Sequence, residues 1–310
     1  MKHYAPRNAF TLIEVVFAIV ILGIVASIGS DMIVRTYTTY VHQKAIHNAS
    51  FKTELAINQI ANRLAYRIDN SVIARKPGQT GTTSGTDFYE LISVPDAEKK
   101  DFNILEWIGY DNDGLDSGGW SGFVDLNASS FLMAITPDSS LDDEDDYLSN
   151  LDLDGNSPAI MFLGASGFYR TDDPNATYRP SCMYAGGNDA CMFPVAMSGT
   201  GLSFGGGDRS NGVMQYTELY LLAASAYAVV PSNPHTIAGI DVWDLWLHTN
   251  YQPWAGDNYT QARTQQLLVK NVSVFRFSQE PNSVRVKLCT VEQTDLNETL
   301  SICKEKAVIR

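Results

Sequence analysis

A run of apolar residues near the N-terminus constrains this 310-residue chain more than any other feature. Residues 10–30 read FTLIEVVFAIVILGIVASIGS, in which 15 of 21 residues are apolar and Glu14 carries the only charge. A helix of about 20 apolar residues spans the hydrocarbon core of a bilayer. Lys2 and Arg7 precede the run without any acid, and the positive-inside rule keeps such a leader cytoplasmic. We therefore expect a transmembrane helix over residues 10–30, with the rest of the chain on the opposite side.

A cleaved secretory signal peptide is the alternative for this segment, and composition alone fits it about equally well. Glu14 argues against it. Placing an acid at the bilayer centre costs about 2.5–3.5 kcal/mol of free energy, and a leader that is cut off gains nothing that would offset this cost. No Lys, Arg or His lies between Phe10 and Ser30 to pair with the acid. The carboxylate therefore predicts a partner on another molecule.

The residues around the start of the run carry a family resemblance. Residues 6–16, PRNAFTLIEVV, followed by Gly23, resemble the N-terminus of type IV prepilins and type II secretion pseudopilins. The resemblance implies that a prepilin peptidase cuts between Ala9 and Phe10, that Phe10 is N-methylated, and that the apolar run stays on the mature protein. It also implies that Glu14 faces the Phe10 amine of a neighbouring subunit. The implied partners are other pilin or pseudopilin subunits, the peptidase and an inner-membrane assembly platform.

Two residues depart from the pattern of that family. Ala9 stands where glycine is usual, and Asp31 stands near where many major pilins have a helix-kinking proline. The resemblance covers about residues 5–40. It therefore concerns topology and processing, and the role of the remaining chain has to be read from its own residues.

Helical spacing of apolar residues continues beyond the membrane run. Ile57, Ile60 and Leu64 share one stripe, and the Pro77-Gly78 pair ends the pattern. A continuous helix from Phe10 to Arg75 would be about 100 Å long. We expect its outer part to pack on a sheet of its own domain rather than to form a coiled coil with a partner. The predicted organisation is a cytoplasmic leader (1–9), a transmembrane helix (10–30), a continuing helix (31–75) and a globular domain (76–310).

The globular domain is acidic and rich in predicted strands. Residues 76–310 hold 14 basic and 31 acidic side chains, a net charge of -17, which disfavours nucleic-acid binding because phosphate contacts need Lys and Arg. A helix packed on antiparallel strands gives an α+β fold. The predicted strands are Phe88–Val94, Phe131–Thr136, Ala159–Leu163, Glu218–Val230, Ile240–Leu247, Leu267–Phe277 and Val284–Cys289.

The clearest strand signal lies near the C-terminus. Val284, Val286 and Leu288 alternate with Arg285 and Lys287, as expected for a half-buried strand of an antiparallel hairpin. This hairpin also resembles the last sheet of larger minor pilins and of J-type pseudopilins. The resemblance implies a minor pilin or pseudopilin rather than a major one.

Four cysteines, Cys182, Cys191, Cys289 and Cys303, lie in the part of the chain expected to face the oxidising periplasm. Pairing by neighbourhood predicts Cys182 with Cys191 and Cys289 with Cys303. Zinc is the alternative, but no C-x2-4-C pair and no nearby histidine supports it. We therefore expect two disulfides.

Calcium is a candidate ligand of the acidic clusters. Asn150, Asp152 and Asp154, followed by Gly155, resemble the start of an EF-hand loop, but the twelfth position is Met161 instead of a bidentate Glu. These three residues are the candidate metal ligands, and no other cofactor is expected. A second fragment starts at Asp111, and the acidic run at 142–146 predicts a solvated loop.

No catalytic motif is recognisable, so an enzyme is not predicted. Gly164–Phe168 lacks the second glycine of a nucleophile elbow, and Gly199–Gly207 lacks the Lys-Ser/Thr of a phosphate loop. The prediction is a minor pilin or pseudopilin subunit of a type IV pilus or a type II secretion system, between which the sequence does not distinguish. A pilus-displayed adhesin and a membrane-anchored periplasmic protein of another function, such as a hydrolase, are the alternatives.

Overall fold

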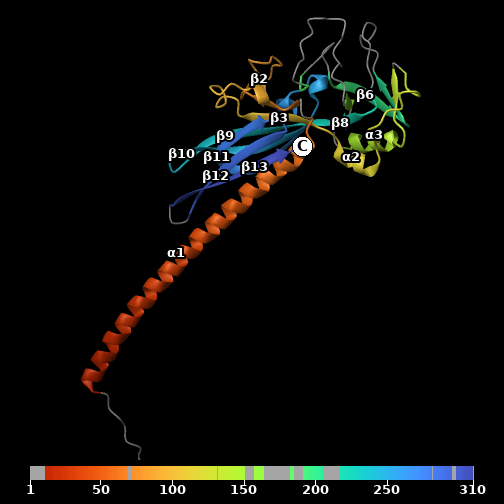
Figure 1. The fold of residues 1–310 in the computed structure, drawn as a ribbon. Coiled ribbons are helices and arrows are strands. Elements are labelled where there is room, and N and C mark those ends of the chain that lie inside the picture. The colour runs from red at the N-terminus through yellow and green to blue at the C-terminus, as the bar shows by residue number, and fades with distance from the viewer. Residues whose placement is uncertain are drawn as a thin grey trace, which may run out of the picture.

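A long helix, α1 (Leu12–Ala65), projects from a β-rich domain (Figure 1). At 1.5 Å per residue its 54 residues extend about 80 Å. Its N-terminal part stands free, whereas its C-terminal part buries an apolar stripe against the domain. A computed structural model describes residues 11–68, 71–130, 132–150, 157–163, 182–184, 191–204, 217–280, 282–294 and 298–309.

The helix ends earlier than its sequence predicts. The expected end was Arg75, but α1 stops at Ala65. The next residues leave the helix because β3 (Ile104–Gly109) offers them a strand partner: the Ile68 N–H donates to the Ile108 carbonyl at 2.8 Å. The chain then forms β1 (Ile73–Arg75), which pairs antiparallel with β3. The prediction that residues 31–75 continue the helix is therefore wrong for its last ten residues.

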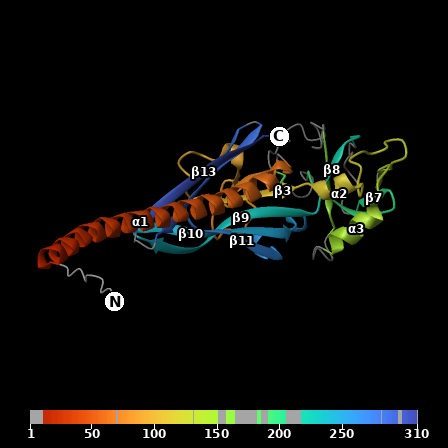
Figure 2. The same cartoon turned by 90° about the horizontal axis from the view of Figure 1, so that it is seen from below.

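The larger of two sheets has eight antiparallel strands in the order β13-β12-β11-β10-β9-β3-β1-β2. The C-terminal part of α1 lies across β11, β12, β13 and β3 of this sheet (Figures 1 and 2). The strands not yet located are β2 (Phe88–Glu90), β9 (Ser225–Ile237), β10 (Ile240–Tyr251), β11 (Thr264–Glu280), β12 (Ser283–Gln293) and β13 (Thr299–Ile309).

The smaller sheet lies at the end of the domain farthest from the free part of α1 (Figure 2). Its five strands run in the order β4-β7-β6-β5-β8, and only Ala224 separates β8 from β9, so one nearly continuous segment serves both sheets. The strands are β4 (Met133–Ile135), β5 (Ala159–Phe162), β6 (Phe193–Ser198), β7 (Gly201–Phe204) and β8 (Tyr220–Ala223). The short helices are α2 (Asn112–Ser117), α3 (Leu141–Ser149), η2 (Leu91–Ser93), η4 (Pro253–Ala255) and η5 (Tyr259–Gln261).

The domain has two apolar cores. Ile60 and Leu64 of α1 pack with Trp107 and with the inward residues of β12, while a second cluster around Trp120 and Phe162 joins the smaller sheet to buried residues of β1, β3 and β9. Burial of these side chains supplies most of the favourable free energy of folding. The α+β architecture, with a long N-terminal helix on antiparallel sheets, is the pilin-like fold that the sequence predicted.

Charged and polar side chains fasten α1 to the C-terminal hairpin. Lys52 Nζ lies 3.1 Å from Glu292 Oε1, and Lys304 Nζ lies 3.3 Å from Glu54 Oε2. Three further contacts extend the series along the helix: His42 with Glu298, Thr53 with Thr290, and Asn58 with Lys306. The hairpin therefore follows α1 over several turns.

Candidate functional site

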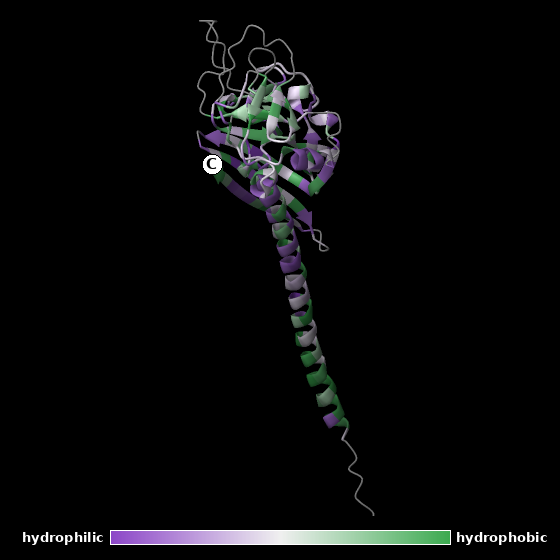
Figure 3. Ribbon diagram, turned by 90° about the vertical axis from the view of Figure 1, so that its right-hand side faces the viewer, coloured by the Kyte–Doolittle hydropathy of each residue, from purple (hydrophilic) through white to green (hydrophobic). Residues whose placement is uncertain are grey.

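The free part of α1 is an exposed apolar surface. Leu12 is 84% exposed and Ile33 is 71% exposed, and the 18-residue window that qualifies as a candidate membrane span has no buried residue. Figure 3 shows the hydrophobic colouring concentrated in this part of the helix. Exposed apolar surface of this extent marks a membrane or protein contact. By length and composition, this helix can cross a membrane.

Glu14 lies in the first turn of that surface, beside a shallow apolar hollow lined by Val15, Ala18, Ile19 and Leu22. Its backbone N–H donates to the Thr11 carbonyl at 3.1 Å. No side chain in the described part of the chain pairs with its carboxylate. Among the described residues nothing pairs with the acid that the sequence singled out, which leaves its carboxylate open to a group on another molecule.

The next charges on the helix mark the far end of the apolar run. Arg35 Nε lies 3.0 Å from Asp31 Oδ2, one turn apart, with both side chains largely exposed. An i,i+4 pair of this kind adds a few tenths of a kcal/mol to a helix. The uncharged span between Glu14 and Asp31 is thus bounded by an unpaired acid at one end and an internally paired acid at the other.

Several predicted site residues lie outside the described residues. These are Ala9 and Phe10 at the processing site, and Asp152 and Asp154 of the calcium candidate. Asn150 is described: it caps the C-terminus of α3, and its side-chain amide donates to the Asp146 carbonyl at 2.7 Å. Within the described ranges, no three His, Cys, Asp or Glu side chains are grouped to hold a metal ion. Calcium at this loop stays a prediction.

Both disulfides join the cysteines that sequence neighbourhood paired. Cys289 and Cys303 face each other across β12 and β13, with their Cα atoms 4.0 Å apart. Cys182 and Cys191 lie 5.4 Å apart between their Cα atoms. The second bridge holds the segment 182–184, whose Met183 and Tyr184 enter the domain interior. One disulfide thus holds the segment 182–184 in the domain, and the other joins β12 to β13.

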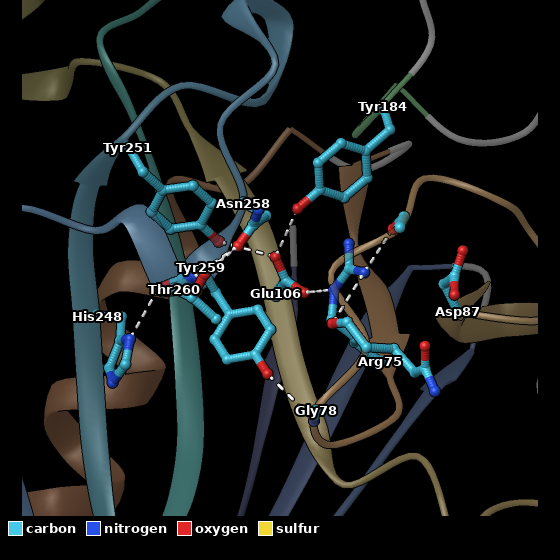
Figure 4. Close-up of polar contacts among 12 residues, drawn as sticks. Arg75, Gly78, Asp87, Glu106, Tyr184, His248, Tyr251, Asn258, Tyr259 and Thr260 are labelled. Atoms are coloured by element: carbon cyan, nitrogen blue, oxygen red, sulfur yellow. Dashed lines mark hydrogen bonds and ion pairs between the residues drawn. The ribbon is translucent and has the colours of Figure 1, made fainter.

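A buried charge cluster joins β1, β3 and the disulfide-held segment (Figure 4). Arg75 and Glu106 are fully buried, and the Arg75 Nε donates to the Glu106 carboxylate. The hydroxyls of Tyr184 and Tyr251 each donate to Glu106 Oε2 at 3.0 Å. Arg75 Nη1 also donates to the Gly81 carbonyl at 2.7 Å. Three groups from separate segments, Tyr184, Tyr251 and the Gly81 carbonyl, therefore converge on one ion pair.

The titration behaviour of the cluster follows from its burial. Burial opposes the charge of Arg75, but the attraction of Glu106 outweighs it and raises the arginine pKa. Burial, and then the negative charge of Glu106, raise the pKa values of Tyr184 and Tyr251 well above their ordinary value, so both hydroxyls stay protonated and donate. The guanidinium also lies 4.8 Å from the centre of the Tyr184 ring. The cluster is a structural fastening, and it offers no unpaired nucleophile.

The sequence contains a signal for this cluster. β3 reads ILEWIG, six buried residues in which Glu106 is the only charge. A buried carboxylate needs a partner, because an unpaired buried charge is very costly. A single acid inside a short apolar run therefore indicates a buried ion pair.

A second buried acid lies between α2 and α3. Glu144 is only 3% exposed, and it faces Asp111, whose Oδ1 accepts the Gly114 N–H at 3.2 Å as the N-cap of α2. Glycine at 114 and 119 leaves room for the carboxylates, because a Cβ at 114 would meet those of Asp111 and Glu144, and a Cβ at 119 would meet that of Glu144. The expectation of a loop over residues 142–146 is wrong: these residues form part of α3, whose buried residues Leu141, Glu144 and Leu148 share one face, and the other four acids are exposed as expected.

The stability of the protein should fall as the pH rises from 5 to 9. Burial, followed by the hydrogen bond and charge of Asp111, raises the pKa of Glu144 to about 8. Because this value exceeds the unfolded one, the folded state holds the extra proton, and stability is lost progressively as the pH rises from the unfolded pKa to about 8. Glu144→Gln should flatten the pH dependence of Tm, whereas Asp143→Asn, an exposed neighbour, should leave it unchanged. Equal pH profiles for wild type and Glu144→Gln would contradict the assignment.

Comparison with known proteins gives one match. Residues 5–30 match the family model of the prokaryotic N-terminal methylation motif, which covers the processing site, Glu14 and the whole apolar run. No curated protein and no solved structure matches the chain. The motif is that of a structural subunit rather than of an enzyme, and an exposed apolar helix fits a membrane anchor. The chain thus carries the prepilin-type signature of type IV pilins and pseudopilins, joined to a pilin-like α+β fold.

Proposed function

We propose that this chain is a minor pilin or pseudopilin subunit that assembles through α1 into a type IV pilus or a type II secretion pseudopilus. The observation that supports it most directly is the free apolar part of α1, which the domain leaves uncovered. Before assembly a bilayer can cover this surface, and afterwards the helices of neighbouring subunits can. The same surface therefore serves as membrane anchor and as assembly face.

The topology we propose places the leader in the cytoplasm and the globular domain in the periplasm. Lys2 and Arg7 precede the apolar run without any acid, which supports this orientation by the positive-inside rule. The two disulfides also suit an oxidising compartment. Prepilin peptidase would then cut between Ala9 and Phe10, and an inner-membrane platform would extract the mature subunit.

Assembly, in this proposal, pairs the Glu14 carboxylate with the methylated Phe10 amine of the adjacent subunit. The apolar hollow beside Glu14 excludes water once a second helix covers it. At low dielectric the attraction between opposite charges is strong, and desolvation of an unpaired acid is expensive. The pair would therefore favour the helix position that brings Glu14 to the neighbouring Phe10 amine over positions that leave the acid unpaired.

Mass spectrometry of the membrane-purified protein tests the processing step. We expect a mature chain that starts at N-methyl-Phe10, because residues 5–30 match the methylation motif. Ala9→Gly should be processed at least as completely, since glycine is the usual residue there, and a bulky Ala9→Leu should accumulate as the precursor. A mature N-terminus near Ser30 would show that the apolar run is a signal peptide and would refute the proposal.

A further inference from the structure

A cleft of about 400 Å³ opens where the end of α1 meets α2, α3 and the larger sheet. Its walls are supplied by the end of α1, the start of α2, the end of α3, and β9, β10 and β11. It is separate from the apolar surface of α1 and shares no residue with the Arg75–Glu106 cluster. Clefts of this size that combine aromatic walls with a few polar groups are typical of ligand sites.

Four tyrosines line the cleft: Tyr66, Tyr110, Tyr147 and Tyr227. Tyr66 packs edge-on against Tyr110 with the ring centres 5.6 Å apart, and Tyr227 stacks on Trp107 at 5.6 Å. Tyr66 and Tyr147 are 41% and 44% exposed, so their rings remain accessible. Tyrosines held in this way present large amphipathic contact area at low entropic cost.

The polar groups of the cleft both donate and accept hydrogen bonds. Burial, then the charges of Asp113 and Asp111, raise the pKa of Tyr147, and burial also raises that of Tyr227, although Arg63 opposes it. The hydroxyls therefore stay protonated and can act as donors or acceptors. Amide side chains of Asn62 and Gln266 add both functions at the edges of the cleft.

The charges of the lining exclude several ligand classes. Arg63 is the single cation among the lining residues, against Asp111 and Asp113, so a phosphorylated ligand would meet net repulsion. An alkyl chain would cover the acids and amides of the lining and leave them without hydrogen-bond partners. An organic cation would have to lie near the Arg63 guanidinium.

We infer that this cleft binds a unit of a neutral oligosaccharide. A sugar ring offers an apolar C–H face that can lie on a tyrosine ring, and hydroxyls at its edge that both donate and accept hydrogen bonds. Those two properties match the accessible rings of Tyr66 and Tyr147 and the mixed polar groups around them. Saccharide binding would be a function of the globular domain, independent of the assembly proposed for α1.

Calorimetric titration of the full-length mature protein tests this inference. The protein is kept in a detergent without a sugar headgroup, and the probes are neutral tetrasaccharides of glucose, galactose, mannose and N-acetylglucosamine. We expect at least one to bind with a Kd of about 1 mM or lower. Tyr66→Ala and Tyr147→Ala should each weaken that binding about tenfold, because each removes a stacking surface. Tyr40→Ala is the matched control, since Tyr40 lies on the same helix, is 59% exposed and does not line the cleft.

Each other outcome overturns the inference. No saturable binding of any of the four probes up to about 10 mM would do so, as would binding that both cleft variants retain. Tetramethylammonium chloride is a counter-probe: if it binds, loses binding in Asp113→Asn, and no saccharide binds, the cleft is a cation site. Thermal melts of each variant show whether the domain is folded, and Tyr147→Ala, on the surface of α3, keeps the test informative if Tyr66→Ala unfolds.

Discussion

Glu14→Gln should leave the protein inserted and cleaved but lower its incorporation into sheared fibres or tip complexes by about tenfold or more. The substitution removes the charge that we place opposite a neighbouring Phe10 amine, and a pair of this kind in a low-dielectric contact is worth more than one in water. Insertion is not impaired, because a neutral side chain lowers the cost of entering the bilayer. Immunoblots that compare fibre and membrane fractions measure the effect for this subunit alone.

Asp31→Asn is the matched control for that experiment. Asp31 is an acid on the same helix, but it already pairs with Arg35 at 3.0 Å and stays exposed. Its replacement should leave incorporation unchanged, and Glu14→Val should behave like Glu14→Gln. If both Glu14 variants assemble like the wild type in a strain without the native copy, the carboxylate has no docking role, and a membrane-anchored protein of another function becomes the better hypothesis.

Glu106→Ala should lower the free energy of unfolding by about 3–5 kcal/mol, the largest single-residue effect we expect in the globular domain. The variant leaves the Arg75 guanidinium buried without its counter-charge, which is the costly way to break a buried ion pair. It also removes the acceptor of the Tyr184 and Tyr251 hydroxyls. Chemical denaturation of the full-length protein in detergent, followed by tryptophan fluorescence, gives the measurement.

The double variant Arg75→Met/Glu106→Leu distinguishes two causes of the lost stability, an unpaired buried charge and lost packing. Apolar side chains of similar volume often replace a buried ion pair at little cost, so the double variant should recover much of the stability lost in Glu106→Ala. The exposed pair of Asp96 and Lys99 supplies a control, because Asp96→Ala should leave the midpoint of unfolding unchanged. A double variant as unstable as Glu106→Ala would mean that the cluster acts through shape and not through charge.

Local periodicity predicted some elements of the fold well. It failed where contacts between residues distant in the sequence determine the local structure. The free part of α1 and the β11–β12 hairpin follow from runs of apolar residues and from alternation, which depend only on neighbours in the sequence. The stripe that includes Ile68 fits a helix equally well, and its departure from the helix depends on Ile108 of β3, a partner 40 residues away. β13 went unpredicted because the successive charges Lys304, Glu305 and Lys306 mask its alternation. Two of these charges, at 304 and 306, contact α1.

The same division holds for the functional residues. Glu14 could be found from the sequence, because one acid in an apolar run is anomalous wherever the chain folds. The tyrosine cleft could not, since Tyr66 caps α1, Tyr147 lies in α3 and Tyr227 in β9, and the three meet only in the folded domain. Glu144 lay in a run of acids, and only the packing of α3 on α2 distinguishes it from its exposed neighbours.

The alignment of α1 with β13 bears on how the protein carries force. From His42 to Asn58 the helix advances about 24 Å, and the residues that they contact, Glu298 just before β13 and Lys306 within it, lie about 26 Å apart in the same direction. Tension applied to the membrane end of α1 therefore loads these contacts together in shear, instead of opening them one after another like a zipper. The Cys289–Cys303 bridge prevents the hairpin itself from peeling apart. The domain is thus mounted on its helix so that a pull along α1 is shared by these contacts.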